Sequence, residues 1–305
     1  LIACGTDKSD NESTKEEKTS VTITSLDSSK NEIELEVPYN PKRIAILDLA
    51  SLDIIDELGV GDRVVGMAST SIDYLEKYSN DASIKNLGTI KEADLEAVME
   101  CEPDIIFIGG RLSKSYDALS EIAPVVYLAT DTNEGLVNSV SKNAKTIASI
   151  FGMEDKVDSL MSDFGARIDA IKKISSGKTA LVGMTTSGSF NLLGNDGRCS
   201  LIGVEAGFNN LTAAGSTSTH GNETSFETVV KQNPDYIFVM DRDSAISTAG
   251  AKTAKEIVEN ELVKTTDAYK NNHIIYLEHS NVWYTAEGGI PVSYTHLRAH
   301  ETDSY

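Results

Sequence analysis

The chain has 305 residues, of which 40% are hydrophobic, and its formal net charge is −20 at pH 7. This apolar fraction is typical of a folded protein, and the length is sufficient for two α/β lobes that each have their own core. The charge argues against a nucleic-acid partner, because a protein that neutralises phosphates needs a basic surface. An anionic ligand would therefore have to be held by cations gathered in a cleft.

The first 20 residues combine a cysteine with a polar run. Cys4 follows small and apolar residues, which is similar to the end of a bacterial lipoprotein signal, where the cysteine is lipidated. Residues 5–20 are polar and charged without apolar periodicity, as in a disordered, solvated tether. We expect an extracytoplasmic protein anchored to the bacterial cell membrane through Cys4. The alternative is an ordinary cysteine beside a frayed terminus.

Residues 21–152 are expected to form an N-terminal lobe. Its start, residues 21–37, alternates polar and apolar side chains, which predicts a small antiparallel hairpin. From Arg43 onward, short continuous apolar runs alternate with amphipathic stretches, which is typical of parallel strands that alternate with helices. Strands are predicted at 44–47, 63–67, 105–108 and 125–128, and helices at 50–58, 115–121 and 134–151.

Residues 153–175 are predicted to form one long helix that links the lobes. Apolar side chains recur there with a helical period, at Val157, Leu160, Met161, Phe164, Ile168, Ile171 and Ile174. At about 1.5 Å per residue the helix would be roughly 30 Å long. Such a rod can cross from one lobe to the other, and it is too stiff for a wide hinge motion.

Residues 176–290 are expected to form a C-terminal lobe, with strands at 180–184, 189–194 and 273–277 and helices from Ser200 and at 253–259. The last residues, 291–305, break the pattern where a closing amphipathic helix is expected. They resemble translated sequencing-adapter read-through, so we interpret them as a non-native tail. His296 and His300 in this tail are rejected as a metal pair, because no third ligand accompanies them.

Two cysteines remain besides Cys4. Cys101 and Cys199 fall in different predicted lobes and in apolar surroundings. We interpret both as small buried side chains rather than as a disulfide, although an exported setting would permit one.

Two stretches of the chain repeat each other, residues 95–111 and residues 226–242. Glu96 corresponds to Glu227 and Arg111 to Arg242, with an offset of 131 positions in every matched pair. Each copy indicates a short helix, a Pro-Asp turn, a buried strand and an arginine just past the carboxyl end of that strand. Ligands of open α/β sheets bind outside these ends, so the two arginines are predicted to face one cleft between the lobes.

The features above resemble the siderophore-binding lipoproteins of iron-uptake ABC transporters, from about Pro41 to Gly289. The resemblance implies two Rossmann-like lobes joined by one long α-helix, with a ligand cleft between them. It also implies a monomer without catalysis or intrinsic cofactor, which carries Fe(III) within its ligand and partners a permease and its ATPase. The branch of this family to which the chain is most similar handles ferric catecholate siderophores. The matching segments are PKRIAILDLASLDIIDELGV, GTIKEADLE, PDIIFIGGRLSKSYDALSEIAP, STHG, PDYIFVMDR and VWYTAEGG.

The resemblance places three cleft arginines at Arg111, Arg198 and Arg242. A guanidinium group is planar, permanently charged and weakly hydrated, which suits catecholate oxygens in a partly desolvated cleft. The alternative for a single arginine is a surface ion pair, and the repeat argues against it for Arg111 and Arg242. Arg198 rests on the resemblance alone. Its neighbourhood also departs from the family, since Gly197 and Cys199 stand where serine and phenylalanine are usual.

The resemblance also implies that His220 and Tyr284 complete the iron shell when the siderophore supplies only four oxygens. Ferric iron accepts phenolate oxygen readily and imidazole as well. The alternative is a loop histidine bonded to backbone and a half-buried tyrosine. Trp283, beside Tyr284, is expected to contact the ligand.

Glu96 and Glu227 lie in the first turns of the repeated helices, after the expected N-caps Asp94 and Ser225. In the resembling family, matching acids on each lobe dock onto permease arginines. The alternative is local, because carboxylates stabilise helix N-termini by ~0.3–1 kcal/mol without any partner.

Other functions stay open at this point. A hydroxamate siderophore, haem or a corrinoid would use the same fold with less negative charge on the ligand. An enzyme with a nucleotide or metal cofactor is disfavoured, because the chain has neither a GxGxxG turn after its first strand nor a P-loop. A scaffold or adhesin would lack a small-ligand cleft altogether.

Overall fold

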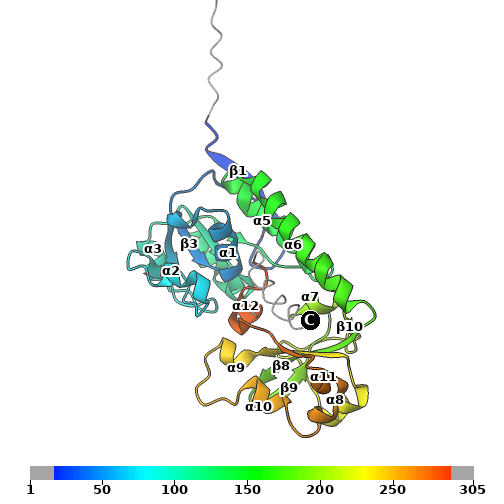
Figure 1. Cartoon of the computed structure of the whole chain (residues 1–305). Helices are drawn as coiled ribbons and strands as arrows, with labels where there is room; N and C mark the ends of the chain where they lie inside the picture. Colours follow the sequence, from blue (N-terminus) through cyan, green and yellow to red (C-terminus); the bar gives the residue numbers. More distant parts are fainter. Residues whose placement is uncertain (1–16, 290–305) are drawn as a thin grey trace, which may run out of the picture.

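The computed structural model describes residues 17–289 and shows two α/β lobes side by side along a long helix (Figure 1). The predicted fold class is confirmed. Cys4, most of the expected tether and the expected tail with His296 and His300 lie outside the described residues.

The first lobe is built on a five-stranded parallel sheet in the order β5-β4-β3-β6-β7. The central strands β3 and β6 bury all four of their residues, as their continuous apolar runs predicted. The strands are β3 (Ile44–Leu47), β4 (Val64–Met67), β5 (Lys85–Asn86), β6 (Ile105–Ile108) and β7 (Val125–Tyr127). The α-helices are α1 (Leu49–Glu57), α2 (Glu76–Ser79), α3 (Leu95–Glu100), α4 (Tyr116–Ser120) and α5 (Leu136–Ile150), and 3₁₀ turns lie at Gly61–Arg63, Asp73–Leu75 and Gly110–Ser115.

The predicted hairpin consists of the antiparallel strands β1 (Ser20–Leu26) and β2 (Glu32–Pro38). One buried side chain joins it to the edge of the main sheet. The Ser25 hydroxyl donates to the Tyr127 carbonyl at 3.2 Å and accepts from the Tyr127 amide at 2.9 Å. The hairpin therefore covers an edge that would otherwise present unpaired backbone groups.

The second lobe contains a mixed sheet in the order β11-β9-β8-β12-β13, with β10 also paired to β8. β9 runs antiparallel to β8 because Ser187 and Gly188 form a tight turn with φ of 51° and 81°. The strands are β8 (Thr179–Thr186), β9 (Ser189–Leu192), β10 (Asn209–Asn210), β11 (Asn222–Glu223), β12 (Tyr236–Asp241) and β13 (Ile274–Tyr276). The α-helices are α7 (Ser200–Gly203), α8 (Phe226–Gln232), α9 (Arg242–Ala245), α10 (Ala254–Val258), α11 (Asp267–Lys270) and α12 (Ser280–Thr285), and a 3₁₀ turn lies at Val263–Thr265.

The sequence repeat corresponds to a structural one, because α3 leads into β6 as α8 leads into β12. The two aspartates of the Pro-Asp turns have the same role in their lobes. Asp104 accepts the amides of Lys42 and Arg43 just before β3, and Asp235 accepts the amide of Thr179 at the start of β8. Each carboxylate thus fixes the start of the neighbouring strand, which explains why the repeat keeps an aspartate there.

α6 (Glu154–Ser175) packs along α5 and runs from the first lobe to the second (Figure 1). Val157, Phe164, Ile168 and Ile171 of the predicted stripe are buried, whereas Ile174 at its end is 41% exposed. The helix therefore contributes to both lobes, and one hydrophobic cluster extends along it from the first sheet to the second.

Residues 280–289, which were expected to end the C-terminal lobe, return to the first lobe. The Asn281 amide donates to the Ser71 carbonyl at 2.8 Å, and Gly289 packs against Asp53 of α1 so closely that an added Cβ would meet the carboxylate. α12 still packs on α9 and β12 of the second lobe. The segment 280–289 is thus a second connection between the lobes, in addition to α6.

Candidate ligand-binding site

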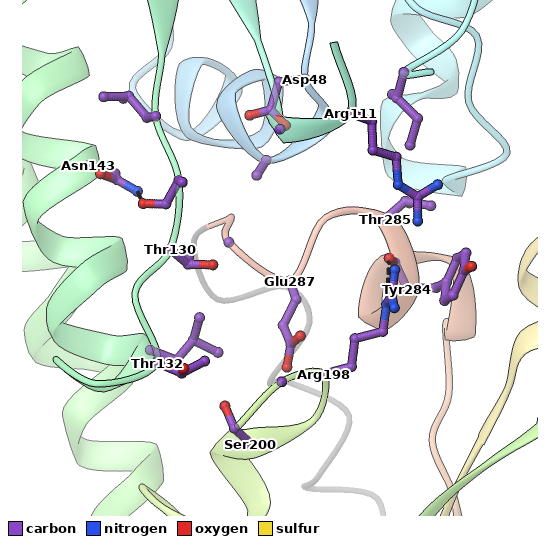
Figure 2. Close-up of a pocket in the computed structure, with 18 of the residues that line it drawn as sticks. Asp48, Arg111, Thr130, Thr132, Asn143, Arg198, Ser200, Tyr284, Thr285 and Glu287 are labelled. Carbon is purple, nitrogen blue, oxygen red and sulfur yellow. Dashed lines mark hydrogen bonds between the residues drawn. The ribbon is translucent and has the colours of Figure 1, made fainter. Parts of the chain in front are cut away.

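A polar pocket of about 520 Å³ lies between the lobes. Its walls come from the start of α1, the turn after β6, the loop after β7, α5, the start of α7 and the end of α12 (Figure 2). The loop before β11 also contributes. Its polar lining includes Asp48, Arg111, Thr130, Thr132, Asn143, Arg198, Ser200, Thr219, Tyr284 and Glu287. Both lobes and the returning segment therefore contribute to one pocket.

Three guanidinium groups surround the ring of Tyr284. The guanidinium carbons of Arg198, Arg242 and Arg111 lie 4.2, 5.5 and 5.6 Å from the ring centroid. Arg111 comes from the first lobe and the other two come from the second. Tyr284 belongs to α12, a helix that lies between the two lobes (Figure 1). The two arginines of the repeat and Arg198, which the resemblance added, therefore converge on one place.

Two of these arginines are held by hydrogen bonds. Arg242 donates through Nε to the Tyr284 hydroxyl at 3.0 Å and through Nη1 to the Thr186 hydroxyl at 3.1 Å. Arg198 donates through Nη1 to the Thr219 carbonyl at 2.8 Å and through Nε to the Tyr284 carbonyl at 3.4 Å. Burial lowers the pKa of Arg198, and the charge of Arg111 adds to this effect. Like charges are thus held together in a partly desolvated place, which favours an anionic ligand.

The phenol of Tyr284 is only 6% exposed, yet its pKa is lowered. Burial by itself would raise this pKa, because it disfavours the phenolate. The hydrogen bond from Arg242, the neighbouring guanidinium group of Arg111 and the charges of Arg198 and Arg242 together outweigh burial. The arginines therefore make this phenol a better oxygen donor to a hard cation.

His220 lies in the loop before β11 and its residue is exposed. Partial burial lowers its pKa, and the charges of Arg242, Arg198 and Arg111 lower it further. All three arginines therefore act on this imidazole as they do on Tyr284. A lowered pKa keeps the ring neutral, which is the form that binds a metal.

The contact expected of Trp283 is wrong for this structure. The indole is 1% exposed and belongs to the hydrophobic core. Consecutive residues of α12 point in different directions, so Tyr284 is aimed at the arginines while Trp283 is buried. Trp283 therefore supports the site from beneath instead of lining it.

Glu96 and Glu227 are exposed and occupy the first turns of α3 and α8. The expected N-caps are present, since Asp94 accepts the Ala97 amide and Ser225 accepts the Thr228 amide. Cys101 and Cys199 are buried and free, as predicted.

Glu287 was not singled out by the sequence. Its carboxylate accepts the Cys199 amide at 2.8 Å, so it fixes the residue that follows Arg198. Burial raises the pKa of Glu287 to about 8, the Cys199 amide and the charge of Arg198 lower it, and the charge of Glu205 raises it. The only signal in the sequence was its place in the VWYTAEGG segment, because the partner is 88 positions away.

Replacing Glu287 by glutamine should change how stability depends on pH. The folded protein holds this proton more tightly than the unfolded chain, so the associated stability is fully present below pH 4.5 and is lost as the pH rises through about 8. Glu287→Gln keeps an oxygen for the Cys199 amide and removes this titration. We expect the variant to be the more stable form at pH 8 by about 1 kcal/mol or more, and similar to wild type at pH 4.5, in urea unfolding. Parallel pH profiles for the two proteins would contradict this.

Two α/β lobes joined by a long helix, with a polar pocket between them, define a bilobal solute-binding protein. The chain belongs to the periplasmic binding protein family, whose sequence pattern matches residues 44–280. No helix among residues 17–289 is both long and apolar enough to cross a membrane.

Relatives of known structure share this architecture. The chain is 37% identical to the petrobactin-binding protein YclQ of Bacillus subtilis over 300 residues, which cover 95% of this chain and 90% of YclQ. The YclQ crystal structure matches with a TM-score of 0.80 at 38% identity, covering 88% of this chain and 93% of that one. The catecholate-siderophore binding protein VctP from Vibrio cholerae gives 0.80 at 30% identity, with 90% and 96% covered. BauB, bound to ferric iron and two acinetobactin molecules, gives 0.78 at 27% identity, with 91% and 96% covered.

Proposed function

We propose that this protein captures a ferric catecholate siderophore between its lobes and delivers it to an ABC importer. The observation that carries the proposal is the convergence of Arg111, Arg198 and Arg242 on Tyr284. Arg111, Arg198 and Tyr284 line the interlobe pocket, and Arg242 contacts Tyr284 without lining it. A ferric catecholate complex is a compact polyanion whose oxygens accept the forked donors of guanidinium groups. The names of YclQ, VctP and BauB, which are all siderophore-binding proteins, support the same ligand class.

Magnitudes indicate that the arginines do not act alone. Charged hydrogen bonds contribute ~1.5–3 kcal/mol each, so three arginines supply roughly 5–9 kcal/mol of the ~12 kcal/mol in a nanomolar complex. The free-energy cost of ordering the ligand and side chains on association makes the shortfall of the three arginines larger. Coordination of Fe(III) by the Tyr284 phenolate and the His220 imidazole would supply the remainder when the siderophore offers only four oxygens. The lowered pKa of each side chain supports this role.

The remaining assignments concern how the captured complex reaches the membrane. Cys4 would carry the lipid that anchors the protein outside the cytoplasm, and Glu96 and Glu227 would dock onto basic residues of the permease. Their exposure at equivalent places on both lobes supports docking to a two-subunit permease. The protein would act as a monomer and without turnover, and the iron would be cargo.

A hydroxamate siderophore, haem or a corrinoid is the alternative ligand. Each carries less negative charge than a catecholate complex, so three converging arginines would be excessive for it. The fold by itself does not distinguish these ligands, since the same architecture serves many of them.

Titration with a synthetic ferric tris-catecholate tests the proposal. We expect saturable quenching of Trp283, because the indole adjoins Tyr284 in the sequence and iron complexes absorb its emission, and we expect co-elution of iron with the protein in gel filtration. The iron-free chelator and a ferric hydroxamate serve as controls and should bind at least about ten times more weakly. Absence of both quenching and co-elution, or tighter binding of the hydroxamate, would overturn the proposal.

A further inference from the structure

The loop that carries His220 is a closed turn. The Gly221 amide donates to the Ser218 carbonyl at 3.0 Å, and the Ser218 hydroxyl donates to the Gly221 carbonyl. The Ser218 amide also donates to the side chain of Asn222 at 3.1 Å. These bonds define the shape of the turn, and other contacts decide where it lies against the cleft.

One of these contacts comes from β9. The Asn191 side chain donates through Nδ2 to the His220 carbonyl at 2.8 Å. Gly221 has a φ of 77° and lies directly on Asn191, since a Cβ at position 221 would be 2.8 Å from the Asn191 Cβ. Just after the turn, Asn222 pairs with Leu192 as β11 begins. The loop is therefore placed against β9 at the residue that carries the imidazole.

The other contact comes from the cleft. Arg198 donates to the Thr219 carbonyl, directly before His220, and also to the Tyr284 carbonyl. A single guanidinium group thus joins the two backbone segments that bear the expected iron ligands. Asn191 donates to the next carbonyl group, that of His220, so the turn is held at two consecutive carbonyl groups.

The oxygen atom of the Asn191 side-chain amide, Oδ1, also bears on the role of this residue. This atom is buried without a hydrogen-bond partner in the described part of the chain. An unsatisfied buried oxygen destabilises a fold, so its presence calls for an explanation such as a role in a site. The opposite amide orientation would place this oxygen against the His220 carbonyl, so the bond from Nδ2 fixes the side chain as it stands.

We propose that Asn191 is a positioning residue that sets the reach of His220 toward Tyr284, and that it thereby determines whether the protein holds siderophores with four iron-binding oxygens as well as those with six. The inference rests on the proposed function. A complex with six oxygens needs no ligand from the protein, whereas one with four needs both side chains at a fixed separation. Loss of the Asn191 bond should therefore weaken one class of ligand selectively.

The test compares two ferric complexes, of a synthetic tetradentate bis-catecholamide and of a hexadentate tris-catecholamide, on the full chain. In Asn191→Ala we expect binding of the tetradentate complex to weaken about 5- to 10-fold, and binding of the hexadentate complex to stay within about two-fold. We expect the wild type to shift the visible charge-transfer band of the tetradentate complex, and with Asn191→Ala this band should move back toward its value in solution. His220→Ala should show the same pattern, and the double variant should show no further loss.

Two more variants make the result specific. Gly221→Ala displaces the same turn from its other side, because position 221 is left-handed and crowded by Asn191, so it should reproduce the selective loss. Asn138→Ala removes a comparable amide-to-carbonyl bond of 3.1 Å within the first lobe and should change neither affinity. Thermal unfolding of each variant reports on folding, and Asn191→Ser replaces the alanine variant if that one is unstable.

The outcomes separate this inference from the proposed function. Equal weakening of both complexes, or no change in either, overturns the positioning role of Asn191. If the wild type binds both complexes but His220→Ala leaves the tetradentate affinity and its band unchanged, the positioning role falls and the siderophore-binding function stands. If the wild type binds neither complex, the proposed function fails.

Discussion

Replacing Arg111 and Arg242 together by alanine should weaken binding of a ferric tris-catecholate at least about 100-fold. Two charged donors are lost, one from each lobe, and each contributes ~1.5–3 kcal/mol. The change should also raise the pKa of Tyr284, because Arg242 donates to its hydroxyl and both arginines favour its phenolate. Fluorescence titration at low and at high salt measures the affinity, and the salt dependence should become shallower in the double variant.

A matched control is available on the linker helix. Arg167 of α6 lies 3.8 Å from Asp163 and does not line the pocket, so Arg167→Ala removes a positive charge without touching the site. Its affinity should stay within about two-fold of wild type. A ferric hydroxamate should lose much less affinity than the catecholate in the double variant. A loss below about ten-fold for the catecholate would remove the arginines from the proposed mechanism.

The arginines of the repeat could be predicted because their signal is local. A short apolar run marks a buried parallel strand, and the residue just after it must lie at the edge where ligands bind. Arg111 and Arg242 satisfied this rule at the same offset. Arg198 had no such signal, since it precedes a four-residue helix and is placed by carbonyl groups of Thr219 and Tyr284.

Contacts between residues far apart in the sequence explain what could not be predicted. Two-residue strands such as β5 and β11 exist only through pairing with their neighbours, and no propensity marks them. The return of 280–289 to the first lobe depends on Asn281 and on the close packing of Gly289 against Asp53. Trp283 was misplaced for the same reason, because burial is decided by which face of α12 meets the core.

The positions of Glu96 and Glu227 lead to the second large effect. Reversing both charges, as Glu96→Arg with Glu227→Arg, should reduce importer-dependent iron uptake at least about ten-fold and leave siderophore binding unchanged. The acids lie outside the pocket on exposed first turns, one on each lobe, so a permease that contacts both lobes would meet two repulsive pairs. Uptake of radiolabelled iron, supplied as the ferric catecholate to cells that carry the importer, measures the effect.

The matched control changes net charge by the same amount at other helix starts. Glu76 and Glu154 are exposed in the first turns of α2 and α6, so the double change to arginine there should leave uptake near the wild-type level. Single variants at Glu96 or Glu227 should give intermediate uptake, because each acid would contact a separate permease subunit. Acidic side chains in a first turn also stabilise their helices by ~0.3–1 kcal/mol, so a purely local role predicts lower thermal stability with normal uptake. That result would remove the docking assignment and leave the binding function intact.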